Sequence, residues 1–316
     1  MTETTTSNAL FDKSSSAGRA GDKVFSTLAL VAGILILAVL ALVAAFLVTE
    51  SIPALTAGEE ELSGEHGNFW TYVLPLMGGT IIASAIALLL ATPVAVGVAL
   101  FISHYAPRKL SQLIGYVIDL LAAIPSVVYG AWGMATLGPL MVPLYEWLQT
   151  YLGWIPLFSG PASTTGRTIL TAGVVLSVMV LPIITSMCRE IFVQTPKLHE
   201  EAALALGATR WEMVKMSVFP FARAGIISAI MLGLGRALGE TMAVTLVLSP
   251  GGFTWNLIGA GNQTIPSEIA LNFPEAFGMR QSELIAAGLV LFVITLAVNM
   301  IARWIVNRHK EFSGAN

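Results

Sequence analysis

Residues 201–240 read EAALALGATRWEMVKMSVFPFARAGIISAIMLGLGRALGE, a polar segment that runs directly into a long apolar one. The apolar part is long enough to cross a bilayer, which takes about 20 residues, yet it carries Arg236 and Glu240. A charge near the middle of a membrane costs about 2.5–3.5 kcal/mol even on a lenient insertion scale. This stretch therefore predicts a membrane protein with functional charges inside the membrane, and transport is the leading interpretation.

The composition of the chain is that of a membrane protein. Of the 316 residues, 55% are hydrophobic and only 11% are charged, whereas an ordinary soluble domain carries about 25% charged residues. The net charge of −3 says little about partners, because in a membrane protein the distribution of charge between loops matters more than the total. No basic patch indicates nucleic acid as a partner. The single cysteine, Cys188, cannot form an internal disulfide, and its place at the end of an apolar run indicates a packing role.

The sequence carries no catalytic or metal-binding signal. It has no Gly-Lys dipeptide and hence no Walker A phosphate loop, so the chain is not expected to hydrolyse ATP. The four histidines lie in loops or tails without metal-ligand spacing and are expected to be solvated: His66, His104, His199 and His309. We therefore expect a protein that is not an enzyme and that holds no metal or cofactor of its own.

Six apolar segments predict an all-α membrane protein with six transmembrane helices. Residues 1–23 are polar and rich in Ser and Thr, and we expect a disordered cytoplasmic tail there rather than a cleavable signal peptide. Residues 24–310 are expected to form one transmembrane domain. Its spans are placed at 24–48, 72–103, 112–135, 168–188, 222–248 and 282–306.

The charges of the connecting loops orient these spans by the positive-inside rule. Residues 49–71 hold five Glu and no Lys or Arg, whereas the connections at 104–111 and 189–221 and the C-terminal tail are basic. Both termini are therefore predicted to be cytoplasmic. The loop at 136–167 is rich in Trp, Tyr, Pro and Gly, which fits either an amphipathic piece at the membrane interface or a packed external loop.

The cytoplasmic loop at 195–220 has clear helix punctuation. Thr195-Pro196 predicts an N-cap followed by proline at the first helical position, and Gly207 predicts the end of that helix. Thr209 with Glu212 three residues later matches a capping box, which begins a second short helix. Charged and apolar side chains are mixed along the loop, so its residues alone leave open whether it lies on lipid or in a protein groove.

Arg236 and Glu240 are four residues apart, so on a continuous helix they share a face and can approach each other. Gly235 and Gly239 form a G-x-x-x-G, which lets a neighbouring helix come close. Arginine suits an oxyanion such as phosphate because its planar guanidinium donates two hydrogen bonds and keeps its proton. We predict a translocation path at Arg236 and Glu240, with Glu240 holding the guanidinium when no anion is present. A structural ion pair remains the alternative.

The polar loop resembles the EAA loop of bacterial ABC importer permeases. That pattern reads Glu-Ala-Ala, three residues, Gly, nine residues, Ile, one residue, Leu-Pro. The match runs from Glu201-Ala202-Ala203 through Gly207 to Pro220, and it departs at Ser217 and Phe219, where Ile and Leu are expected. Residues 235–244, GRALGETMAV, and residues 124–130, IPSVVYG, are similar to the phosphate-specific members of these importers, the PstC family.

The resemblance implies a MetI-like fold whose last five spans form the core of an inner-membrane permease for phosphate. It also implies three partners: a PstA-like second permease subunit in a heterodimer, a dimer of ATP-binding subunits that hold ATP and Mg²⁺, and an extracytoplasmic phosphate-binding protein. In that family the EAA loop docks in a cleft of the ATPase. The residues expected to contact the ATPase are Glu200, Glu201, Ala202, Ala203, Gly207 and Pro220.

Three other functions compete with a phosphate permease. An ABC importer of another oxyanion, such as sulfate or molybdate, would need the same loop and the same arginine. A secondary carrier could use Glu240 as a proton site and would need no ATPase. A membrane scaffold or sensor would use the charges for packing only. Uptake competition among oxyanions and uptake without the ATPase separate these alternatives.

Overall fold

The computed structural model describes residues 15–58, 62, 68–252 and 254–310, and in these ranges the chain forms helices and loops without a strand. The α-helices are α1 (Ser15–Thr56), α2 (Phe69–Leu100), α3 (Arg108–Ala122), α4 (Ser126–Trp132), α5 (Gly138–Leu152), α6 (Ile169–Val193), α7 (Lys197–Ala205), α8 (Arg210–Met213), α9 (Phe219–Gly239), α10 (Met242–Val247), α11 (Ile265–Asn272) and α12 (Met279–Lys310). Six helical stretches of the described residues are long and apolar enough to cross a membrane, which confirms the predicted fold class.

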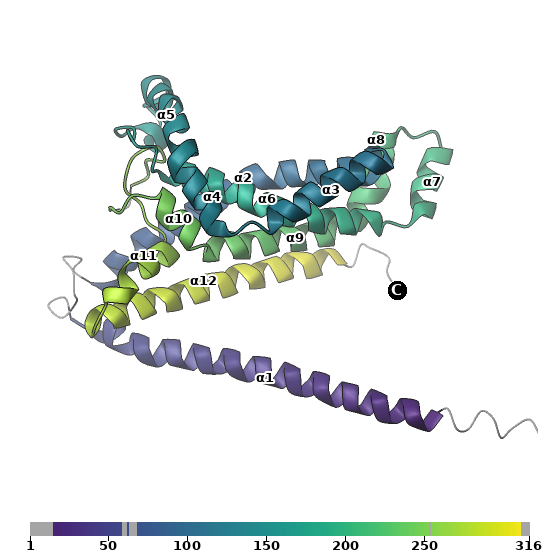
Figure 1. Cartoon of the computed structure of the whole chain (residues 1–316), viewed down its shortest axis with the longest axis horizontal. Coiled ribbons are helices and arrows are strands. Elements are labelled where there is room, and N and C mark those ends of the chain that lie inside the picture. The colour runs from purple at the N-terminus through teal and green to yellow at the C-terminus, as the bar shows by residue number, and fades with distance from the viewer. Residues whose placement is uncertain (1–14, 59–61, 63–67, 253, 311–316) are drawn as a thin grey trace, which may run out of the picture.

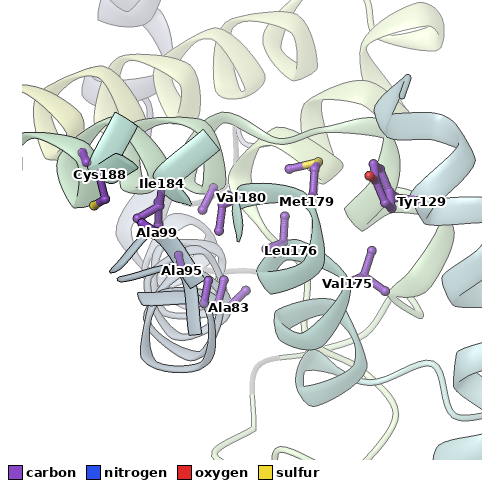
Figure 2. Packing of buried hydrophobic residues seen from close by; sticks show 14 of the residues in the cluster. Ala83, Ala95, Ala99, Tyr129, Val175, Leu176, Met179, Val180, Ile184 and Cys188 are labelled. Carbon is purple, nitrogen blue, oxygen red and sulfur yellow. The ribbon is translucent and has the colours of Figure 1, made fainter. Parts of the chain in front are cut away.

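The core is built on α2, α6 and α9, which lie side by side. One face of α2 carries alanine at every fourth position from residue 83 to residue 99, and these alanines are at most 1% exposed. Figure 2 shows part of this row beside Leu176, Val180 and Ile184 of α6. Small side chains let the two backbones approach closely. Gly173 of α6 extends this contact, because a Cβ there would lie 2.5 Å from the side chain of Ile86.

Cys188 is fully buried in this core, which confirms its predicted packing role.

The third predicted span is broken rather than continuous. Helix α3 ends at Ala122 and α4 begins at Ser126, so the expected helix over 112–135 is wrong. Pro125 has no N–H to donate and disfavours a helical conformation in the residue before it, which accounts for the break. The candidate span instead runs over Ser126–Leu152. Residues 138–152 of the expected 136–167 loop are therefore helical and belong to a candidate span, so the loop itself begins only after α5.

The fifth span is shifted in the same way. It runs over Arg210–Gly239, because α8 continues into α9 through a π-helical turn at Val214–Val218. The second short helix expected in the cytoplasmic loop is thus the first turn of the span, and Pro220 lies inside the helical stretch rather than before it. The span ends at Gly239, nine residues before the predicted end, and α10 follows as a separate helix.

Helix α1 stands apart from the rest of the chain. It contacts α12 near one end and diverges from it toward the other (Figure 1). The most apolar window of α1 has no buried residue. Its start at Ser15 lies inside the tail expected over 1–23, so that boundary was placed too late, and residues 1–14 lie outside the described residues.

Candidate functional site

The loop over residues 195–220, called the coupling loop below because it is predicted to contact the ATPase, lies at one end of the long helices. There α7 and α8 project from the bundle (Figure 1). Helix α7 ends at Ala205, and Gly207 follows with a φ of +86°, which glycine adopts without the strain of a side chain. Nothing in the described residues lies within 4 Å of a Cβ added at Gly207. The prediction that Gly207 forms the turn between two helices is confirmed.

Both arms of the loop begin with a cap, and only one cap was predicted correctly. Thr209 accepts a hydrogen bond from the Glu212 N–H, and the Glu212 carboxylate accepts one from the Thr209 N–H, which is the expected capping box. At α7 the N-cap residue is Pro196, without a side-chain hydrogen bond. The Thr195 hydroxyl is buried and has no partner in the described part of the chain, so its predicted capping role is wrong.

The residues of the EAA pattern divide between two faces of α7. Glu201 and Ala202 are exposed, whereas Ala203 is buried against the core and Glu200 is partly buried. Leu206 is 87% exposed and presents an apolar side chain at the tip of the loop. An outward face that mixes a carboxylate with apolar side chains suits either a groove of another protein or the membrane surface.

His104 joins the loop to the core and corrects the expectation that it is solvated. Its side chain is only 8% exposed, and its Nε2 lies 3.4 Å from the Oε1 of Glu200. Its Nδ1 is 2.7 Å from the Ser103 Oγ, and its ring packs edge-on against Phe192 at the end of α6. Phe192 in turn contacts Phe219 at the start of α9. The expectation for His66 lies outside the described residues.

Arg236 lies in the last turn of α9 and is exposed, as a path residue must be. It borders a hollow of about 570 Å³ between α6, α9 and α12. The other lining residues are Ile183, Ser228, Met231, Leu232, Gly235 and Asn299. Two neutral polar side chains therefore share this hollow with the guanidinium.

Glu240 does not pair with Arg236, and the predicted ion pair is wrong. Glu240 has an extended backbone, with φ −70° and ψ 127°, so the two residues do not share a helical face. Its Oε1 accepts a hydrogen bond from the Ala243 N–H at 3.3 Å, and the carboxylate thus lies at the N-terminus of α10. Negative charge is favoured there by the free N–H groups and the helix dipole. Among the described residues, Arg236 forms no ion pair.

The expected helix contact at Gly235 and Gly239 is not made by the part of the chain that the structure describes. Nothing in the described residues lies within 4 Å of a Cβ added at either glycine. The close approach occurs elsewhere, at Gly130 of α4, where a Cβ would lie 2.6 Å from the Cα of Ala243. The two segments that carry the phosphate-permease resemblance, 124–130 and 235–244, therefore pack against each other.

A buried charged cluster lies where α2, α11 and α12 meet, and the sequence did not reveal it. Arg280 binds the carboxylates of Glu268 at 2.6 Å and Glu283 at 2.9 Å. Its guanidinium lies 4.9 Å from the ring centroid of Tyr72, whose hydroxyl donates to Glu268 at 3.1 Å. Only the i, i+3 spacing of Arg280 and Glu283 could have signalled part of it.

No group of three or more His, Cys, Asp or Glu side chains that could hold a metal ion occurs among the described residues.

Comparison with known proteins shows which family the chain resembles. Residues 91–311 match the family described as binding-protein-dependent transport system inner membrane component. The phosphate transport system permease protein PstC 2 of Mycobacterium tuberculosis is 44% identical over 96% of this chain and 97% of its own length. The phosphate transport system permease protein PstC of Mesorhizobium japonicum is 39% identical over 93% of this chain and 92% of its own length.

Solved structures show the same fold at lower identity. A chain of the inward-facing MetNI methionine ABC transporter has a TM-score of 0.52 at 20% identity, over 75% of this chain and 94% of that one. A chain of a bacterial ABC transporter that imports alginate has a TM-score of 0.52 at 20% identity, over 92% of this chain and 99% of that one. At this identity the likeness concerns the fold alone.

Proposed function

The chain belongs to the family of binding-protein-dependent transport system inner membrane components, and we propose from this premise that it is the permease subunit of an ABC importer for inorganic phosphate. It is not an enzyme, since ATP is hydrolysed by separate subunits. It resides in the bacterial cytoplasmic membrane. The relatives named as phosphate permeases cover almost the whole chain, which supports phosphate over sulfate or molybdate as the cargo.

The observation that carries the proposal is the exposed guanidinium of Arg236 in an apolar spanning helix, next to a hollow and without a carboxylate partner in the described residues. A permanent positive charge costs free energy inside a membrane unless an anion or water compensates it. Arginine also recognises phosphate through two parallel hydrogen bonds. We assign Arg236 to the translocation path, and Glu240 to the cap of α10 next to that path.

The partners follow from the surfaces that the chain leaves open. We propose that the outward residues of α7, Glu201 and Ala202, together with Gly207, engage one subunit of an ATPase dimer. Pro220 and Glu200 act behind this contact. The open face at Gly235 and Gly239 has room for a helix of a PstA-like second permease subunit. A phosphate-binding protein delivers the anion at the opposite end.

The test compares two arginines of the same helix. Arg236→Gln is expected to lower ATP-driven phosphate uptake in proteoliposomes at least tenfold, because a charge-assisted contact with the anion contributes about 1.5–3 kcal/mol. Arg223→Gln removes an exposed charge at the cytoplasmic end of α9 and serves as the matched control. Normal uptake in assembled Arg236→Gln complexes contradicts the proposed role.

A competition assay separates the oxyanions. Phosphate is expected to block uptake of labelled phosphate, while excess sulfate or molybdate leaves it unchanged. Uptake that persists without the ATPase and collapses with the proton gradient would instead identify a secondary carrier.

A further inference from the structure

Two loops line an open pocket at the end of the molecule opposite to α7 and α8, and several polar side chains are set in its largely apolar wall. The loops follow α5 and α10, and Figure 1 shows both of them far from the coupling loop. The pocket has a volume of about 760 Å³ and is lined by residues between 156–165 and 249–260. No carboxylate lines it, and its polar side chains are those of Ser and Thr residues, the amide of Asn256 and the indole of Trp255. It is separate from the hollow beside Arg236.

Asn256 supplies an unused hydrogen-bond donor to this pocket. The residue is only 8% exposed, and its Oδ1 accepts a hydrogen bond from the Ile258 N–H at 3.1 Å. No group in the described part of the chain accepts a hydrogen bond from its Nδ2. The Nδ2 itself is not sealed off, since it is absent from the buried polar atoms that lack a partner. It therefore reaches the pocket, where an acceptor oxygen of a ligand can take the place of water.

The loops are built to leave room for this amide. A Cβ added at Gly160 would lie 2.3 Å from the Nδ2 of Asn256, and one added at Gly259 would lie 2.5 Å from the same atom. Both glycines line the pocket. Any larger residue at either position would displace the Asn256 side chain, so the two glycines keep its NH₂ group at the pocket wall.

Hydroxyl groups extend the set of donors. The Ser163 N–H donates to the Ile258 carbonyl at 2.8 Å and thereby ties the two loops together. The Ser163 Oγ lies 3.3 Å from the Thr165 Oγ1, and both residues line the pocket. Hydroxyls rotate to donate toward an acceptor ligand. Ser, Thr and Asn side chains from both loops can therefore donate to one small molecule with several oxygens.

A positively charged side chain lies close in sequence to the first pocket loop. Arg167, two residues after Thr165, donates from its Nη2 to the carbonyl of Leu248, the residue before Ser249 of the pocket. Its Nε is buried without a partner in the described residues, where it also forms no ion pair with a carboxylate. Arg167 does not line the pocket, but a guanidinium without an ion pair in the described residues raises the electrostatic potential of this segment, which favours an anion over a cation.

We propose that this pocket is an oxyanion subsite that receives inorganic phosphate before it reaches Arg236. The inference rests on the proposed function and adds a first anion-binding site to the proposed path. One short segment connects the two sites, because α10 begins three residues after Gly239 and ends just before Leu248 and Ser249. Asn256 is the specificity-determining donor of the subsite, and Arg167 sets its positive potential.

Equilibrium binding of radiolabelled phosphate to the purified transporter, without ATP and without the binding protein, tests the proposal. All chains carry Arg236→Gln, so that the site at Arg236 does not contribute. Asn256→Asp keeps the acceptor for the Ile258 N–H but replaces the NH₂ donor with a negatively charged oxygen. It is expected to weaken phosphate binding at least tenfold, the loss of one hydrogen bond to a charged ligand.

Two further variants guard against a loss of folding. Asn68→Asp makes the same charge change at the exposed N-cap of α2, where Asp caps as well as Asn, and it should bind phosphate normally. Gly160→Ala fills the space next to the amide without adding charge and should weaken binding as Asn256→Asp does. Assembly of each complex is checked by size-exclusion chromatography.

Each result decides one question. Unchanged phosphate affinity in assembled Asn256→Asp and Gly160→Ala complexes overturns the subsite. Displacement of phosphate by short-chain phosphatidylglycerol also overturns it, since the occupant is then a lipid headgroup. Wild-type complexes that fail to take up phosphate in proteoliposomes refute the proposed function itself, whatever the binding assay shows.

Discussion

The contact between His104 and Glu200 gives a quantitative prediction about coupling. His104→Ala removes the 3.4 Å contact with the Glu200 carboxylate and the edge-on packing on Phe192. A hydrogen bond contributes about 0.5–1.5 kcal/mol net, more when one partner is charged, and the length of this one places it near 1 kcal/mol. Because 1.4 kcal/mol corresponds to a factor of ten in an equilibrium constant, the fraction of molecules in which α7 has left its position against the core should rise about fivefold in the variant.

The assay measures phosphate transported per ATP hydrolysed in proteoliposomes that contain the complete transporter. This ratio is expected to fall about fivefold in His104→Ala while the complex stays assembled, because ATPase motion then reaches α2 and α6 less reliably. His104→Gln keeps a donor near Glu200 and should restore most of the ratio. His199→Gln changes an exposed histidine of the same loop and is the control. An unchanged ratio in His104→Ala refutes the reasoning.

Three further changes test the turn, the core and the buried cluster. Gly207→Val places a β-branched residue at a φ of +86°, at a cost of about 1–2 kcal/mol, and should reduce co-purification of the ATPase. Gly173→Leu should lower the melting temperature of the detergent-solubilised complex, because overpacking a core costs about 1–3 kcal/mol; Gly97→Leu, with open space around it, should not. Arg280→Met removes the cation that pairs with two buried carboxylates, and a loss of about 3–5 kcal/mol should show in thermal unfolding, whereas Arg303→Met, at an exposed site, should have no effect.

Local signals in the sequence were sufficient for the coupling loop. The capping box at Thr209 and Glu212 and the turn at Gly207 depend on residues within one helical turn, so their geometry follows from the residue types alone. The number of spans also follows from local hydropathy. The prediction that Thr195 caps α7 was wrong because Pro196 is the N-cap residue and makes no side-chain hydrogen bond. The burial of the Thr195 hydroxyl depends on tertiary packing, which the local sequence does not reveal.

Helix boundaries inside apolar segments were not predictable from hydropathy. Residues 222–248 are apolar on both sides of Glu240. A hydropathy profile is the same whether or not the helix is interrupted, so it does not reveal the break. The break depends on tertiary contact, because Gly130 of α4 packs directly on Ala243 of the next helix. The buried cluster was missed for a related reason, since Tyr72 and Glu268 are joined only by the fold.

The break at Glu240 changes the electrostatics that the sequence suggested for the path. On a continuous helix Glu240 would lie one turn from Arg236 and would neutralise it, and an incoming anion would have to displace a carboxylate. In the structure the carboxylate instead binds the N-terminus of α10, where the helix dipole stabilises its charge. In the proposed path the Arg236 guanidinium is therefore available to an anion, and Glu240 also caps the short helix that leads to the pocket at Asn256. A proton carrier that uses Glu240 would require this residue to give up its bond to α10, which makes an arginine-centred anion path the simpler use of the two charges.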